Sequence, residues 1–200
     1  MVKYNHVVHY TDNPYNGMFT YIREQNNGQN PLTCQAIDVY ISKGFRGITS
    51  DLFEYSNTLH GWNLKEIANN FICFDFKENK ISLEAYTIKS GSASSYWEFP
   101  VNFAIEGSNN NSSWSMIDDK PNNMELGANN KTYTWKCNKS PLYRYIRFRL
   151  KSIYQCCGLF TDHFEFFGGI NNVGVRRQIS LNFMYYIIFH IPPIDLFFLS

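Results

Sequence analysis

The sequence lacks an excess of charge of either sign. It holds 18 lysine and arginine residues against 17 aspartate and glutamate residues, so the formal net charge is +1. Proteins that bind nucleic acid gain much of their affinity from a basic surface that neutralises phosphates, and this chain offers no overall basic field. We therefore expect no nucleic-acid partner.

Cysteine pairs with the spacing of a metal or redox site are absent too. The five cysteines are an odd number, and no two of them show the two-residue separation typical of zinc sites and redox motifs. The adjacent Cys156 and Cys157 would supply only two of the roughly four ligands that a zinc site needs. We expect reduced thiols, no metal and no cofactor.

The N-terminal region has no long apolar run. Val7 and Val8 are its only apolar pair, whereas a secretory signal needs about seven or more consecutive apolar residues. No export signal is visible, and a cytoplasmic location is therefore expected.

A catalytic pattern is also missing. No serine elbow accompanies Asp162-His163, and no glycine-rich loop is present to cradle a phosphate. The carboxylates of Asp75, Asp118 and Asp119 come without a supporting signature. We therefore expect a protein that is not an enzyme.

Aromatic residues, in contrast, are abundant. They make up 18% of the chain, with 17 Phe and 14 Tyr, and such side chains favour pleated, half-buried strands. About eight short alternating runs separated by turns, without a long amphipathic helix between them, predict an all-β fold, an antiparallel jelly-roll β-sandwich. Residues 17–24, GMFTYIRE, suit either a short helix or a first strand.

Two stretches carry clear strand patterns. Residues 71–90 predict two antiparallel strands joined by a turn at Glu78-Asn79. Residues 101–118 predict a hairpin, because an alternating run ends in Asn109-Asn110-Asn111 and asparagine tolerates the positive φ angles of hairpin turns.

Residues 144–151 show a clear alternation of apolar and basic side chains. The pattern predicts a strand that buries Ile146, Phe148 and Leu150. Its other face is basic, which suits either an acidic lipid or partner or, more simply, a solvated surface. The basic residues are Arg144, Arg147, Arg149 and Lys151.

Read in order, the segments FICFDFK, AYTIKS, FAIEGSNNNSSWSMID, RYIRFRL and HFEFFGG resemble the signature strands of the discoidin domain, also called the coagulation factor V/VIII type C domain. The sequence is most similar to the cytosolic variant of protist proteins and of BTB-associated domains, which opens with a segment similar to NGMFTYI. This resemblance implies a galactose-binding-like fold whose loops at one end bind glycans, phospholipid headgroups or proteins, without catalytic machinery.

The resemblance also divides the chain. It implies a lead-in at 1–16, a discoidin-like domain at 17–170 and an apolar extension at 171–200. Secreted members tie their two ends with a disulfide, and this chain lacks the C-terminal cysteine for it. Residues 178–199 have the length of a membrane span, but a mid-span Asp195 costs about 3 kcal/mol. A tail that packs on the sandwich, or a non-native extension, is favoured over membrane contact.

The expected contact end consists of loops 43–49, 91–97 and 154–161. Amphipathic aromatic rings on such loops can stack on a sugar, although Trp97 would equally suit a cover for one end of the core. The prediction is a non-catalytic recognition module for a glycan or cell-surface-type ligand. The alternatives are an intracellular protein-interaction module and a membrane-associated protein held by its tail. The candidate ligand-binding residues are Phe45, Arg46, Tyr96, Trp97, Tyr154 and Phe160.

Overall fold

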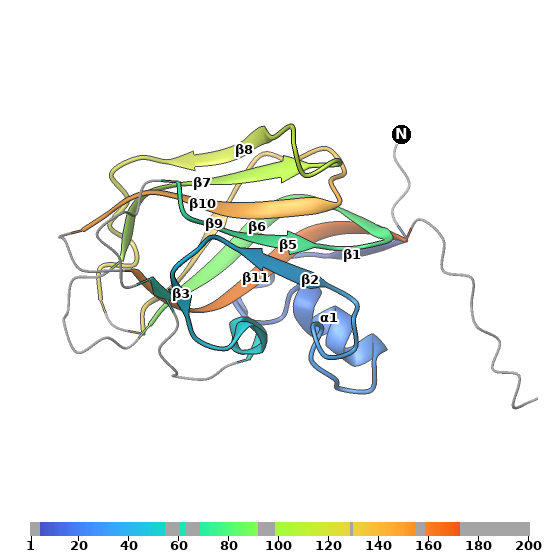
Figure 1. Ribbon diagram of the computed structural model, residues 1–200. Coiled ribbons are helices and arrows are strands. Elements are labelled where there is room, and N and C mark those ends of the chain that lie inside the picture. Colours follow the sequence, from blue (N-terminus) through green and yellow to red (C-terminus); the bar gives the residue numbers. More distant parts are fainter. Residues whose placement is uncertain are drawn as a thin grey trace, which may run out of the picture.

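A computed structural model describes residues 5–54, 61–62, 69–91, 99–128, 130–154 and 159–172. In this part of the chain, two antiparallel sheets pack face to face, and one α-helix and one 3-10 helix lie at their side (Figure 1). The predicted antiparallel β-sandwich is therefore confirmed.

The two sheets draw their strands from all parts of the sequence. The six-stranded sheet has the order β3 (Phe45–Arg46), β4 (Gly61–Trp62), β11 (Leu159–Asn172), β6 (Asn79–Ser90) and β9 (Thr132–Lys136), and β1 (His6–Val8) also pairs with β11. The five-stranded sheet has the order β2 (Asp38–Ile41), β5 (Phe71–Asp75), β10 (Tyr145–Ile153), β7 (Pro100–Ser108) and β8 (Ser115–Lys120).

Aromatic rings fill the space between the sheets. Phe148 of the five-stranded sheet lies between Phe103 and Phe164, with ring centroids 5.3 and 5.6 Å away. Tyr86 stacks on Trp135 and donates a 2.7 Å hydrogen bond to Asp118 Oδ2. The high aromatic content of the sequence is thus used largely to build the core.

The prediction for residues 71–90 needs a correction. Both strands form, but β5 belongs to the five-stranded sheet and β6 to the six-stranded sheet, so they do not pair with each other. Lys77 between them adopts a φ of 57°, and its N–H donates to Asp75 Oδ1 at 2.8 Å. At this turn the chain crosses from one sheet to the other. Phe74 and Leu83 therefore enter the core from opposite sheets.

The predicted hairpin at residues 101–118 is confirmed. β7 and β8 pair antiparallel, with Phe103 and Ile105 fully buried. In the connecting turn, Ser108 Oγ accepts the N–H groups of Asn110 and Asn111 at 3.2 and 3.0 Å, and Asn111 has a φ of 57°. Turn chemistry therefore fixes this connection.

Strand β10 forms as predicted, but its outer face is not simply basic. Ile146, Phe148 and Leu150 are buried. Each basic side chain of the other face meets a carboxylate from another strand of the same sheet, which largely cancels the charge. The ion pairs are Arg144 with Asp75, Arg147 and Arg149 with Glu106, and Lys151 with Asp119.

Residues 18–25 form a helix, which decides the alternative left open by the sequence. Helix α1 (Met18–Gln25) buries Met18, Phe19 and Ile22. Its N-cap residue Gly17 has no capping side chain, and Glu165 of β11 takes that role instead. The Glu165 carboxylate accepts the N–H of Phe19 at 2.8 Å and of Thr20 at 3.3 Å.

One flank of β11 is covered by helices instead of strands. β1 pairs with residues 168–170 and β4 with residues 159–160, and α1 and η1 (Thr49–Phe53) contact β11 between them. Strand β1 lies within the segment that was expected to be a loose lead-in, because its backbone extends the sheet beside Gly168 and Gly169.

Cys34, Cys73 and Cys137 carry free thiols, and burial raises the pKa of Cys73 to about 12. Cys156, Cys157 and the apolar segment 178–199 lie outside the described residues. Among the residues that are described, no helix is long and apolar enough to span a membrane.

Candidate ligand-binding site

Strand pairing brings the first and third predicted contact loops together. Trp62 of β4 pairs on one side with Phe45 of β3 and on the other with Leu159 of β11. The segments that follow residue 43 and precede residue 161 therefore meet at one end of the sandwich, at the left in Figure 1. We call this end, with residues 43–49, 99, 126–128, 154 and 159–161, the loop end.

An aromatic stack joins the second loop to the third. Phe99, which follows residues 91–97, lies parallel to the Tyr154 ring with a centroid distance of 5.2 Å. The Tyr154 N–H also donates to the Phe99 carbonyl at 3.1 Å. Three loops that are far apart in the sequence thus share one supported base.

A fourth segment at the loop end was missed by the sequence reasoning. Ser90 Oγ donates to the carbonyl of Ala128 at 2.6 Å, and the Ser90 N–H donates to the carbonyl of Lys131 at 2.8 Å. Leu126 is completely buried there. Leu126 and Met124, the two large apolar residues of the polar stretch 119–131, were the available signal. A shallow cavity of about 280 Å³ lies here, lined by Met124, Glu125, Gly127, Ala128 and Lys131.

The structure locates four of the six candidate ligand-binding residues. Phe45 and Tyr154 are half-buried and pack against the core, so only part of each ring faces outward. The backbones of Arg46 and Phe160 both pair with Gly61, while their side chains are not described. Tyr96 and Trp97 lie outside the described residues.

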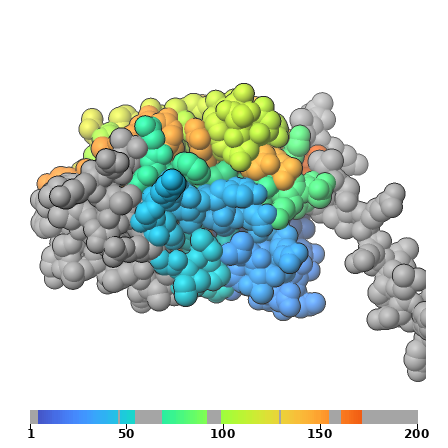
Figure 2. Space-filling view, viewed as in Figure 1, coloured from blue at the N-terminus to red at the C-terminus, as the bar shows by residue number. Residues whose placement is uncertain are grey.

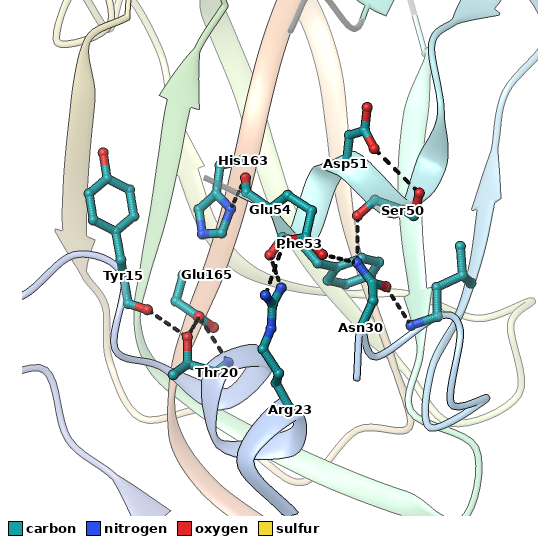
Figure 3. Close-up of polar contacts among 11 residues, drawn as sticks. Tyr15, Thr20, Arg23, Asn30, Ser50, Asp51, Phe53, Glu54, His163 and Glu165 are labelled. Atoms are coloured by element: carbon teal, nitrogen blue, oxygen red, sulfur yellow. Dashed lines mark hydrogen bonds and ion pairs between the residues drawn. The ribbon is translucent and has the colours of Figure 1, made fainter. Parts of the chain in front are cut away.

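A polar network centred on Glu54 fixes the base of the first loop (Figure 3). Arg23 of α1 donates to Glu54 Oε2 at 3.0 Å and to the Phe53 carbonyl at 2.6 Å. Asn30 donates to Glu54 Oε1 at 2.5 Å. Burial alone would raise the pKa of Glu54, but the Asn30 and Arg23 hydrogen bonds hold it below its usual range. η1 is therefore attached firmly to α1.

The same network reaches β11 through a histidine. His163 Nδ1 lies 3.2 Å from the Glu54 carbonyl oxygen, and the Tyr15 ring meets the imidazole edge to face at 5.5 Å. Burial lowers the pKa of His163 to about 4. The imidazole is therefore neutral near pH 7 and links η1 to the sheet.

A buried ion pair lies at the start of β11. Lys89 Nζ is 3.4 Å from Asp162 Oδ2, and Asp162 sits at an irregularity in the pairing of β11 with β6. Burial raises the pKa of Asp162 to about 6, although Lys89 opposes the shift. The other carboxylate oxygen, Oδ1, has no hydrogen-bond partner among the described residues.

The polar groups described above serve mainly to hold loops and strands together. In the described part of the chain, no group of three His, Cys, Asp or Glu side chains is placed to hold a metal ion. The buried polar groups of the loop end instead join loops to strands, which suits a rigid scaffold that presents contact loops.

No protein-family model and no curated protein sequence matches the chain. Several solved structures are similar in fold. The module CpGH89CBM32-6 of Clostridium perfringens is 21% identical, with 70% of this chain and 100% of that chain covered and a TM-score of 0.50.

Two further carbohydrate-binding modules give comparable values. The family 32 module of C. perfringens NanJ, solved with galactose, is 9% identical, covers 68% of this chain and 95% of its own, and has a TM-score of 0.52. The module of AlyQ, solved with 4,5-unsaturated mannuronic acid, is 14% identical, with 65% and 93% covered and a TM-score of 0.52. The chain therefore shares the galactose-binding-like β-sandwich of these modules, a fold that discoidin domains also have.

Proposed function

We propose that this protein is a non-catalytic carbohydrate-recognition module that binds its ligand at the loop end. The observation that carries the proposal is the convergence of three separate contact loops on one rigid end of a sandwich with the fold of carbohydrate-binding modules. Binding then requires little ordering of the scaffold, because α1, η1 and β11 are already tied together.

The ligand class proposed is a small neutral glycan with galactose or N-acetylgalactosamine at its end. Two similar modules support this class, since one was solved with galactose and another with GalNAc-β-1,3-galactose. Within this fold, the order of the signature segments, which form β5, β6, β7, β8, β10 and β11, supports a discoidin-like branch. A cytoplasmic location remains part of the proposal.

A glycan array probed with the full chain tests this function. We expect binding to terminal galactose or GalNAc that is weakened about tenfold or more in Trp97→Ala, since burying a large apolar side chain against a ligand contributes about 1.5–3 kcal/mol. Met116→Ala is the control, because Met116 is an exposed apolar side chain of β8 that lies outside the loop end. A folded protein that binds no glycan would contradict the proposal and favour a protein ligand.

A further inference from the structure

The outer face of the five-stranded sheet holds an arginine, Arg147, that uses only one of its nitrogens in hydrogen bonds to the described residues. In Figure 2, residues of β10 (orange) reach the surface between those of β2 (blue) and the β7–β8 hairpin (yellow-green). Basic and acidic side chains alternate over this face and pair one to one at most positions. Glu106 is different, because two arginines, Arg147 and Arg149, share its single carboxylate.

The two arginines use this carboxylate unequally. Arg149 donates to Glu106 from Nε at 3.0 Å and from a terminal nitrogen at 2.9 Å. Arg147 donates only from Nε, at 2.6 Å. Both terminal nitrogens of Arg147, which carry four N–H donors, make no hydrogen bond in the part of the chain that the structure describes.

Arg147 is nevertheless held in one orientation. Its guanidinium lies over the Trp114 ring, 4.0 Å from the centroid, and 6.0 Å from that of Phe71. Its side chain is only 19% exposed, so much of the conformational entropy that a ligand would otherwise have to remove is already lost. A planar guanidinium with free terminal nitrogens matches the two oxygens of a carboxylate or sulfate.

The neighbours of Arg147 favour an anion. On its row of the sheet, the β5 neighbour is Cys73, whose pKa burial raises to about 12, so the thiol is neutral. The β7 neighbour Glu106 is balanced by two positive charges. Asp75 is engaged by Arg144 through both of its oxygens. The charges of Glu106, Arg147 and Arg149 therefore add up to a net charge of +1.

We propose that Arg147, stacked on Trp114, is a second binding site that recognises the carboxylate or sulfate group of an acidic glycan. Tyr40 lies two strands away on the same row, about 10 Å from Arg147 at the usual strand spacing, and offers an exposed ring to a neighbouring sugar unit. A protein partner fits this face less well. Protein interfaces have apolar cores, and Tyr40 and Met116 are the large exposed apolar side chains described on this face.

The test uses tetragalacturonate as the probe and the full-length protein labelled with ¹⁵N. We expect the acid to shift the Arg147 Nε–H resonance with a millimolar Kd, and the methyl ester of the same tetrasaccharide to leave it unchanged. For the variants, binding is followed at the Trp114 indole N–H. Arg147→Gln should weaken binding about tenfold, as expected for one lost charge-assisted hydrogen-bonded contact.

Two further variants show whether binding depends on the planar guanidinium group or only on positive charge. Lys151→Gln removes one positive charge from the same face of β10 and should change the Kd by about twofold or less, since its pair with Asp119 is exposed. Arg147→Lys keeps the charge but loses the planar group, and should weaken binding about fivefold. Thermal unfolding shows whether each variant is folded.

Three results would overturn the proposal. They are an unshifted Arg147 Nε–H, equal weakening in Arg147→Gln and Lys151→Gln, and binding of a hexaglutamate peptide as tight as that of tetragalacturonate, which would indicate a protein ligand. The site lies away from the loop end, so neutral-glycan binding there can succeed or fail independently.

Discussion

The outer faces of the two sheets stabilise their buried carboxylates by different kinds of contact. On the six-stranded sheet, Glu165 is completely buried beneath α1 and is stabilised by N–H groups without a cation. On the five-stranded sheet, Glu106 is also buried, but it is paired with two arginines whose side chains are 19% and 22% exposed. The covered face therefore depends on hydrogen bonds that water cannot replace, and the open face on ion pairs that water can screen.

This difference shows why the two faces suit different roles. Where helices cover a sheet, an unpaired polar group is costly, so each such group becomes a structural tie between α1, η1 and β11. Where the sheet is open, a donor such as Arg147 can remain available at little cost, because water or a ligand can serve it. Three changes test the comparison.

The largest effect is expected for Glu165→Ala. The change leaves the buried N–H groups of Phe19 and Phe166 without an acceptor and removes the cap of α1. We therefore expect the free energy of unfolding to fall by about 3 kcal/mol or more. Urea unfolding monitored by circular dichroism measures this. Glu165→Gln keeps one oxygen and should lose about half as much. A loss under about 1 kcal/mol in Glu165→Ala would show that Glu165 does not stabilise the covered face.

An intermediate effect, visible in its pH dependence, is expected for Asp162→Asn. Burial raises the pKa of Asp162 from 3.8 to about 6, so the folded state holds the proton more tightly than the unfolded state. The resulting stability is fully present below pH 3.8 and is lost as the pH rises through about 6.

Relative to Asp162→Asn, the unmodified protein should therefore lose up to about 3 kcal/mol between pH 4 and pH 6, at about 1.4 kcal/mol per pKa unit. Urea titrations at several pH values give the difference. The lowered pKa of His163 acts in the opposite direction but cancels, because both proteins contain it. A difference independent of pH would mean that the pKa of Asp162 is the same in the folded and unfolded states.

The smallest effect is expected for Glu106→Gln on the open face. Burial opposes ionisation of Glu106, but the hydrogen bonds from Arg149 and Arg147 hold its pKa below the usual range. The arginines left behind remain partly hydrated, so unfolding should become only about 1 kcal/mol easier, and the loss should shrink in high salt. A loss as large as that of Glu165→Ala would remove the contrast between the faces.

Much of the fold could be predicted from local patterns. The alternation around Ile146, Phe148 and Leu150 reports directly which face of a strand is buried, and all three side chains are buried. Strand partners were harder to predict. β5 and β6 are joined by a short turn, yet they lie in different sheets, because the positive φ of Lys77 decides the direction of the chain and sequence periodicity does not.

The contacts that support the site were largely beyond sequence reasoning. Glu165 occupies a position in HFEFFGG that resembles an outward-facing polar residue, and its partner Phe19 is 146 residues away. The unequal use of Glu106 by Arg147 and Arg149 depends on the bulge between Ile105 and Glu106 and on the position of Trp114. Such features follow from the packing of distant segments, which a single sequence does not encode in any local pattern.

Strand β11 has a mechanical consequence. It runs from the loop end at Leu159 to Asn172 beside β1, a span of about 40 Å at the usual rise per residue. A force between a ligand held at the loop end and an attachment at residue 172 would act along this strand. Its hydrogen bonds to β6 lie across that direction, so they would be loaded together in shear and would not open one after another. The β11–β6 ladder therefore resists separation of the two ends of β11 by many hydrogen bonds acting together.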